Sequence, residues 1–175
     1  PFVAKFADYG SSIVSHLAKN RIRHWDIEIR MLAAQSLSII AKENKDLITI
    51  DILASICAAC ESYDIEIKHG GYEALANLLW VMDIDFDIIK NLLNLPEDCQ
   101  SEEIKCSFIK MLSAAAKRDI SVPELPKYLR EWLISDSKIV QKSAIESLIF
   151  LGNGEKRYLA DDFFNELLHE ISQPG

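Results

Sequence analysis

Two cysteines separated by two residues, Cys57 and Cys60, have the spacing found in zinc sites and in redox-active dithiols. Together with Cys99 and Cys106 they would supply four thiolates, enough for a tetrahedral zinc ion. The sequence contains no second pair at this spacing, and the pair falls in the middle of a segment with helical periodicity. Redox chemistry would require the first cysteine at the start of a helix in a βαβ unit, and no strand is predicted. We therefore predict core thiols, with neither a metal site nor a cofactor.

Side chains that could act in nucleophilic catalysis are present, but not in a familiar arrangement. No Gly-x-Ser-x-Gly sequence occurs, and Gly70-Gly71 does not belong to a phosphate-binding loop. The four histidines are scattered along the chain, at His16, His24, His69 and His169. We therefore predict that the chain is not an enzyme.

The composition favours a helical protein and argues against nucleic-acid or membrane partners. Among 175 residues, 19 Lys and Arg against 27 Asp and Glu give a net charge of -8, which is unfavourable for binding polyanions. Only 6 Gly and 5 Pro are present, too few for a many-turned β fold. The apolar runs are shorter than the roughly 18 to 20 residues of a membrane span. The chain begins at Pro1 without a leader-like segment, so we expect a fragment of a longer protein.

A repeat organises the helical pattern. The segment 25–30, Trp-Asp-Ile-Glu-Ile-Arg, returns at 63–68 as Tyr-Asp-Ile-Glu-Ile-Lys, and two degenerate copies follow. Four apolar anchors therefore recur every 36 to 38 residues, at Ile29, Ile67, Ile104 and Val140. Eight residues after these anchors stand Leu37, Leu75, Leu112 and Leu148. Apolar or small residues at fixed offsets of 4, 8 and 11 lie on one helical face, so each copy predicts a helix, a short turn and a second helix.

This periodicity predicts an all-α fold, an α-α superhelix of the HEAT or armadillo type in which two-helix units stack into a solenoid. Four polar side chains are expected to cap the second helices: Asp26, Asp64, Ser101 and Ser137. We expect one solenoid fragment with repeats at about 11-42, 46-82, 85-117 and 124-151, and a partial fifth repeat at 158-172.

The first copy resembles one particular helical-repeat family. His24-Trp25-Asp26, followed by Ile29-Arg30, Leu32-Ala33-Ala34 and Ser36-Leu37, is similar to the segment HWDxxIRxLAAxSL of the tubulin-folding cofactor D family. One repeat later, Lys68-His69-Gly70-Gly71 resembles the basic-His-Gly sequence at the equivalent point in that family. These two motifs cover about a third of the chain, and the remainder matches only as helical repeat.

The resemblance implies a cytoplasmic, cytoskeleton-associated chaperone scaffold. Its partners would be β-tubulin or the αβ-tubulin heterodimer, other tubulin cofactors and an Arf-like small GTPase, during the assembly and disassembly of the heterodimer. The matching residues are turn, cap and core positions, so they assign no partner site. A generic HEAT scaffold, such as a phosphatase regulatory subunit or a nuclear transport receptor, is the alternative.

The best candidate for a partner surface is the face of the second helices opposite the buried stripe. We predict that this face carries the contact residues, which are Met31, Gln35, His69, Glu73, Trp80, Lys110, Lys117 and Ile149. Trp80 has an alternative role, packing over the 83–87 link. The basic residues Arg30, Lys68 and Lys105 recur one position after an anchor, and we expect them to form hydrogen bonds or ion pairs between repeats.

Overall fold

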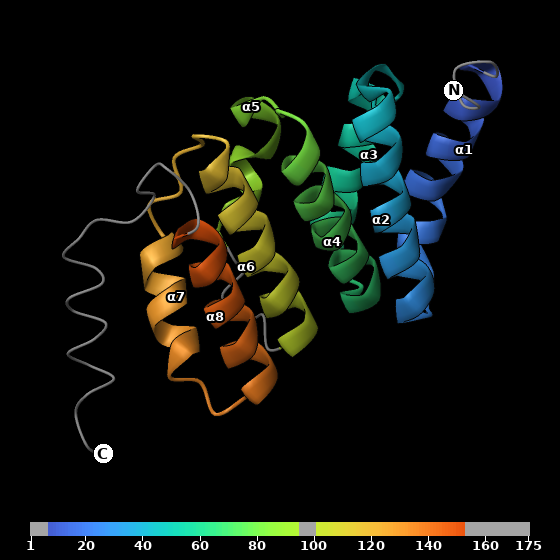
Figure 1. Ribbon diagram of the computed structural model, residues 1–175. Helices are drawn as coiled ribbons and strands as arrows, with labels where there is room; N and C mark the ends of the chain where they lie inside the picture. Colours follow the sequence, from blue (N-terminus) through green and yellow to red (C-terminus); the bar gives the residue numbers. More distant parts are fainter. Residues whose placement is uncertain (1–6, 95–100, 153–175) are drawn as a thin grey trace.

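The computed structural model describes residues 7–94 and 101–152, and every regular element in these two ranges is helical (Figure 1). The α-helices are α1 (Ala7–Lys19), α2 (Ile27–Glu43), α3 (Ile50–Cys60), α4 (Ile65–Val81), α5 (Phe86–Ile89), α6 (Glu102–Lys117), α7 (Leu125–Leu133) and α8 (Lys138–Gly152). Three short 3₁₀ turns lie between them, η2 (Arg21–Arg23), η3 (Lys45–Leu47) and η4 (Lys90–Leu92). The predicted all-α class is confirmed. The expected partial fifth repeat at 158-172 lies outside the described residues.

The helices form two layers. Helices α2, α4, α6 and α8 contact one another in succession and form the second-helix layer. Helices α1, α3 and α5 contact in succession behind it, while α7 packs against α6 and α8. The second helices stand side by side across the molecule with their starts along one edge (Figure 1). This stacking of helix pairs defines a helical-repeat solenoid.

Local side-chain chemistry explains where the second helices begin. The Asp26 carboxylate accepts a hydrogen bond from the Glu28 amide at 2.8 Å, and the Asp64 carboxylate accepts one from the Glu66 amide at 2.9 Å. Such caps satisfy amides that have no partner within the helix. All four predicted caps are confirmed, because Asp26, Asp64, Ser101 and Ser137 each accept from an amide in the first turn that follows.

The core lies between the two layers, and an aromatic cluster fills its C-terminal half. Phe108 is fully buried at the centre of this cluster. Its ring makes edge-on contacts with Tyr72, Tyr128 and Trp132, at centroid distances of 5.4, 5.3 and 6.3 Å. Aromatic pairs favour such T-shaped geometry over face-to-face stacking. The cluster therefore joins α4, α6 and α7 into one packed unit.

Two adjacent glycines allow α4 to approach its neighbours closely. A Cβ atom at Gly71 would lie 2.5 Å from the backbone nitrogen of Cys60 in α3. A Cβ atom at Gly70 would collide with the carbonyl oxygen of Ile22 in η2. Both obstacles are backbone atoms, which cannot move aside as a flexible side chain can. Glycine is therefore required at these positions by the packing between helices.

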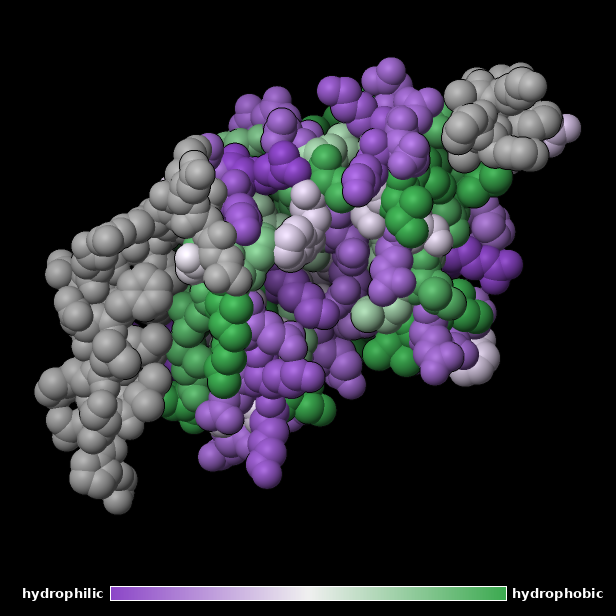
Figure 2. Space-filling view, in the orientation of Figure 1, coloured by the Kyte–Doolittle hydropathy of each residue, from purple (hydrophilic) through white to green (hydrophobic). Residues whose placement is uncertain are grey.

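The exposed surface is mixed in character. In Figure 2, hydrophilic side chains cover the middle of the visible face, and hydrophobic side chains gather over α2 and α8 on either side. The exposed large apolar residues on these two helices are Ile27, Leu32 and Ile39 in α2, and Ile139, Ile145 and Ile149 in α8. Within the described ranges, no helix has both the length and the apolar character needed to cross a bilayer.

Candidate partner-binding surface

The structure does not place the eight predicted contact residues on one continuous surface. Gln35, Trp80 and Ile149 are exposed, and Met31, Lys110 and Lys117 are half-buried. His69 and Glu73 are only 4% and 3% exposed, so the expectation that they face a partner is wrong. Both lie in α4, which is enclosed by α2 on one side and α6 on the other. Their side chains serve contacts between these second helices.

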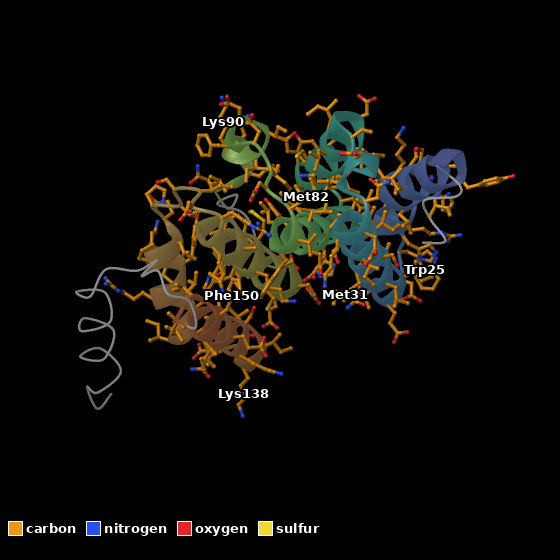
Figure 3. The ribbon with its side chains drawn as sticks, turned by 45° about the horizontal axis from the view of Figure 1, so that its top comes forward. Trp25, Met31, Met82, Lys90, Lys138 and Phe150 are labelled. Carbon is orange, nitrogen blue, oxygen red and sulfur yellow. The ribbon has the colours of Figure 1, made fainter. Side chains whose placement is uncertain are left out.

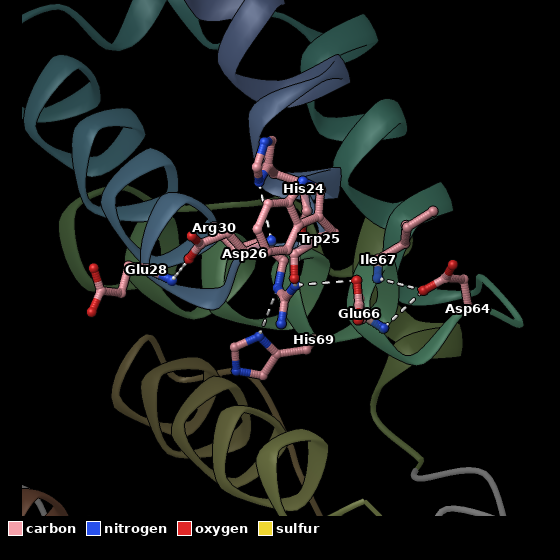
Figure 4. Close-up of polar contacts among 9 residues, drawn as sticks. All are labelled: His24, Trp25, Asp26, Glu28, Arg30, Asp64, Glu66, Ile67 and His69. Atoms are coloured by element: carbon pink, nitrogen blue, oxygen red, sulfur yellow. Dashed lines mark hydrogen bonds and ion pairs between the residues drawn. The ribbon is translucent and has the colours of Figure 1, made fainter.

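Arg30 makes the first of these contacts, at the start of α2 (Figure 4). This buried guanidinium donates to the carbonyl oxygens of His24 and Trp25, both at 2.8 Å, and so closes the turn before α2. It also donates from Nε to Nδ1 of His69 at 3.4 Å, and it lies 3.7 Å from the Glu66 carboxylate. The expectation that Arg30 joins neighbouring repeats is confirmed, since His69 and Glu66 belong to α4.

The second contact joins α4 to α6. The ammonium of Lys110 lies 3.0 Å from the buried carboxylate of Glu73, which would otherwise be an unpaired charge in the core. Burial lowers the pKa of the neighbouring His69 imidazole, and the positive charges of Arg30 and Lys110 act in the same direction. The carboxylate of Glu73 opposes this shift. Arg30, His69, Glu73 and Lys110 thus form a polar seam across α2, α4 and α6.

The two sequence motifs that carry the family resemblance meet in this seam. Arg30 belongs to the first motif and His69 to the second, and their hydrogen bond spans 39 positions in the chain. Gly70, which follows His69, packs against the η2 turn that precedes the first motif. The motifs are therefore largely structural, and Trp25, with 75% of its surface exposed, is the residue in them that most clearly faces solvent.

Trp80 lies in an exposed cluster at the C-terminal ends of α4, α6 and α8. Its ring lies 4.0 Å, centroid to centroid, from the ring of Phe150 in α8. The Lys117 ammonium from α6 sits 3.9 Å from the centre of the same Phe150 ring and donates to the Phe150 carbonyl. Figure 3 shows Phe150 where α6 and α8 lie side by side. We call Trp80, Lys117 and Phe150 the aromatic-lysine cluster.

The contact of Trp80 with Phe150 does not test the alternative role predicted for Trp80, packing over the 83–87 link. Arg118 joins the end of α4 to that link, because its guanidinium donates to the carbonyls of Leu79 and Trp80 and to the Asp83 carboxylate. Together with the aromatic-lysine cluster, Arg118 lines a shallow pocket of about 240 Å³. Trp80 remains 52% exposed at its rim, which leaves much of the indole accessible to a partner.

Sequence reasoning missed Phe150 and Arg118. Phe150 follows Ile149 in α8, at a position equivalent to the small Ala114 in α6, so the pattern gave no reason to single it out. Arg118 stands at the C-cap of α6, where a basic residue is common for reasons local to the helix. Only the packing of α4, α6 and α8 brings these side chains to Trp80.

Ile149 belongs to a different part of the surface from Trp80. The equivalent residues Ala76 in α4 and Ser113 in α6 are buried, and Ser38 in α2 is half-buried. The described residues place no further second helix beside α8, and the Ile149 side chain is 58% exposed. Its exposure therefore follows from its place on the outer side of the layer.

The cysteine pair lies inside α3, as the helical periodicity predicts. Cys60 is buried, and burial raises the pKa of its thiol. Burial also raises the pKa of Cys57 to about 11, and its sulfur donates to the carbonyl of Ile88. Both thiols are therefore protonated near neutral pH and poorly suited to redox or metal chemistry. Among the described residues no three His, Cys, Asp or Glu side chains form a cluster that could hold a metal ion, and Cys99 lies outside these residues.

Fold and surface together define a helical-repeat scaffold, a class of protein that acts by presenting an extended surface to partners. No protein-family model matches the sequence. Over 79 residues, the chain is 34% identical to tubulin-specific chaperone D of Dictyostelium discoideum, and this match covers 45% of the chain. The match spans 5% of that relative's length. The chain thus resembles part of tubulin-specific chaperone D.

A solved structure supports the fold independently. The chain is similar to the crystal structure of an engineered protein, with a TM-score of 0.57 and 20% sequence identity. The similarity covers 92% of this chain and 67% of the other. At 20% sequence identity, this similarity supports the fold of the chain and carries no information about its function.

Proposed function

We propose that this chain is part of a single, non-catalytic helical-repeat scaffold that binds β-tubulin, alone or in the αβ-tubulin heterodimer. The proposal is carried by the identity of 34% over 79 residues to a protein whose name describes a tubulin-specific chaperone. In this proposal the scaffold is cytoplasmic and cytoskeleton-associated, and it acts in the assembly and disassembly of the heterodimer. Other tubulin cofactors and an Arf-like small GTPase would be further partners of the whole protein.

We place the tubulin contact at the aromatic-lysine cluster. Trp80 offers a large, partly exposed indole, and Lys117 offers a positive charge beside it. Tryptophan residues dominate the binding energy of many protein interfaces because they bury a large area with little loss of conformational freedom. Gln35 and Met31 in α2 and Lys110 in α6 are further proposed contacts; Gln35 is exposed, and the other two are half-buried.

Sedimentation velocity of the chain with and without αβ-tubulin tests this placement. We expect a faster-sedimenting complex that persists at moderate salt, and Trp80→Ala should weaken its affinity about tenfold. The substitution also removes the contact with Phe150, at a cost of about 1 kcal/mol in the free energy of unfolding. Phe86→Ala is the control, because Phe86 is a half-exposed aromatic side chain on α5, outside the second-helix layer.

Two results would contradict the proposal in different ways. If Trp80→Ala binds tubulin as tightly as the unmodified chain, the contact lies elsewhere on the surface. If no complex forms at concentrations well above those in the first experiment, tubulin is not a partner of this segment.

A further inference from the structure

Two uncharged stripes lie on the two outermost helices of the second-helix layer. The stripe on α2 consists of Leu32, Gln35, Ser36 and Ile39, and the stripe on α8 consists of Ile145, Leu148, Ile149 and Gly152. Both have the spacing i, i+3, i+4 and i+7, which places their members on one face of a helix. Leu32 and Ile39 are 60% and 64% exposed, and Ile145 and Ile149 are 44% and 58% exposed. We call these sets the α2 stripe and the α8 stripe.

Inside the layer, the position of Leu32 faces the preceding second helix. Its equivalents in α4 and α8 are Gly70 and Ser143. A Cβ atom at Gly70 would lie 3.1 Å from the Arg30 side chain of α2. The Ser143 hydroxyl donates to the Cys106 carbonyl of α6 at 3.4 Å. Within the described ranges no second helix precedes α2, so the α2 stripe faces outward.

The position of Ile145 faces the following second helix. Its equivalent in α4 is Tyr72, whose ring packs edge-on against Phe108 of the following helix α6. Tyr72 and the equivalent Ile109 of α6 are buried, whereas Ile145 is not. In the part of the chain that the structure describes, no second helix follows α8, so the α8 stripe also faces outward. Figure 2 shows the result, because hydrophobic side chains gather over α2 and over α8 on either side of the visible face.

The chemistry of both stripes suits a packed helix and not solvent. The outermost repeats of a soluble solenoid normally carry a polar outer face. Here the polar side chains within the stripes are neutral, and the Ser36 hydroxyl is already bonded to the Leu32 carbonyl of its own helix at 2.7 Å. Covering either stripe would therefore remove apolar surface from water without burying a charge within the stripe.

The contacts inside the layer indicate which occupant fits each stripe. Helix α2 packs on α4, α4 on α6, and α6 on α8. Each contact joins the following side of one second helix to the preceding side of the next. Among the residues that the structure describes, the α8 stripe is the free following side and the α2 stripe is the free preceding side. A second copy placed after α8 would therefore repeat this contact once more and bring the two stripes together.

We propose that copies of this chain associate head to tail, with the α8 stripe of one copy packed against the α2 stripe of the next. The contact is heterologous, because it joins two different surfaces. Each copy in a pair therefore keeps one stripe free, and further copies add in the same way. The proposal does not rest on tubulin binding, and its test contains no tubulin.

Sedimentation equilibrium of the full chain over a range of concentrations provides the test. The average mass of the unmodified chain should rise with concentration. Ile145→Lys/Ile149→Lys blocks the α8 stripe, and Leu32→Lys/Ile39→Lys blocks the α2 stripe. Each variant alone should raise the Kd of self-association at least tenfold, because the contact would bury unpaired charge. An equimolar mixture of the two variants should form a dimer and nothing larger, since each retains the stripe that the other has lost.

Ile50→Lys/Ile65→Lys is the matched control. These isoleucines are 62% and 59% exposed at the starts of α3 and α4, outside both stripes, and their substitution adds the same charge. This control should self-associate as the unmodified chain does. Circular dichroism should give similar melting temperatures for all three variants, because each replaces side chains that are already largely solvated.

Four results would overturn the proposal. The first is an unmodified chain that stays monomeric up to about 1 mM, where even weak association is measurable. The second is self-association that persists in either stripe variant alone, which would require a different contact. The third is a mixture of the two stripe variants that remains monomeric. The fourth is a loss of association in the control, which would show that added charge acts without regard to position.

Discussion

At the scale of single residues, buried polar groups explain why part of the predicted surface is internal. The sequence pattern places His69 and Glu73 on the helix face opposite the main apolar stripe. In an amphipathic helix at a protein surface, this opposite face is exposed to solvent. In the solenoid, α4 has a second helix on each side, and Arg30 and Lys110 reach across to these two residues. A buried charge is tolerated when a group of opposite charge lies beside it. Removing one of the two groups leaves the other charge buried and uncompensated. The four side chains of the polar seam therefore stabilise the second-helix layer together.

The lowered pKa of His69 predicts a dependence of stability on pH. An unfolded histidine titrates near about 6.5, and the folded His69 titrates below this value because it is buried. As the pH falls below about 6.5, the unfolded chain binds the proton more readily, so the free energy of unfolding decreases. Above that pH the His69 imidazole is neutral in both the folded and the unfolded chain, so its titration does not change the free energy of unfolding. The charged groups that face His69 are Arg30, Glu73, Glu103 and Lys110.

Thermal melts between about pH 7.5 and about pH 5.5 provide the measurement. The melting temperature should fall with pH in the unmodified chain and fall less in His69→Gln. His16→Gln, which alters an exposed histidine in α1, should keep the full decrease. A decrease of the same size in His69→Gln would show that other groups cause it.

At the scale of elements, the closeness of α4 to η2 sets a strict requirement on Gly70. The Gly70→Ala methyl group would meet the backbone of Ile22, and the helix would have to shift to make room. We expect a loss of about 2 to 3 kcal/mol in the free energy of unfolding and a melting temperature lower by roughly 5 to 10 °C. Denaturant titration and calorimetry measure the two quantities.

Gly152→Ala is the matched control for Gly70→Ala. A Cβ atom at Gly152 would have no neighbour within 4 Å, and alanine has the higher helix propensity. Its stability should be unchanged or slightly higher. Equal losses of stability in the two variants would contradict the conclusion that the contact with Ile22 makes glycine necessary at position 70.

At the scale of the whole molecule, stability should be greatest in the middle of the second-helix layer. Helices α4 and α6 each pack between two other second helices, and most of their side chains are buried. Within the part of the chain that the structure describes, helix α1 has neighbouring helices on one side only. In solenoids, stability is approximately the sum of each repeat and its contacts with adjacent repeats. The middle helices should therefore open less often than α1.

Amide hydrogen exchange measured helix by helix tests this gradient. Exchange in α4 and α6 should be slower than in α1 by about tenfold or more, because opening the middle helices breaks two interfaces. Equal protection in all three helices would show that the described residues unfold as one cooperative unit.

The sequence by itself determined the helices, their order and their caps. Offsets of four and eight residues mark one face of a helix, and Asp26 or Asp64 can accept from an amide only two residues away. These are interactions within a few residues, so a single sequence contains all the information that they require. The repeat also predicted the stacking, because each two-helix unit leaves a face that a neighbour must cover.

Only the tertiary structure decided which side chains face water. Trp80 and Phe150 are 70 positions apart and meet only because α4, α6 and α8 pack in succession. Glu73 is buried where Lys110 of the next helix reaches its carboxylate, whereas Trp25 is 75% exposed at the turn before α2. These outcomes depend on the distances and angles between helices. No periodicity within one helix encodes that geometry, so the candidate surfaces could be located only in the folded molecule.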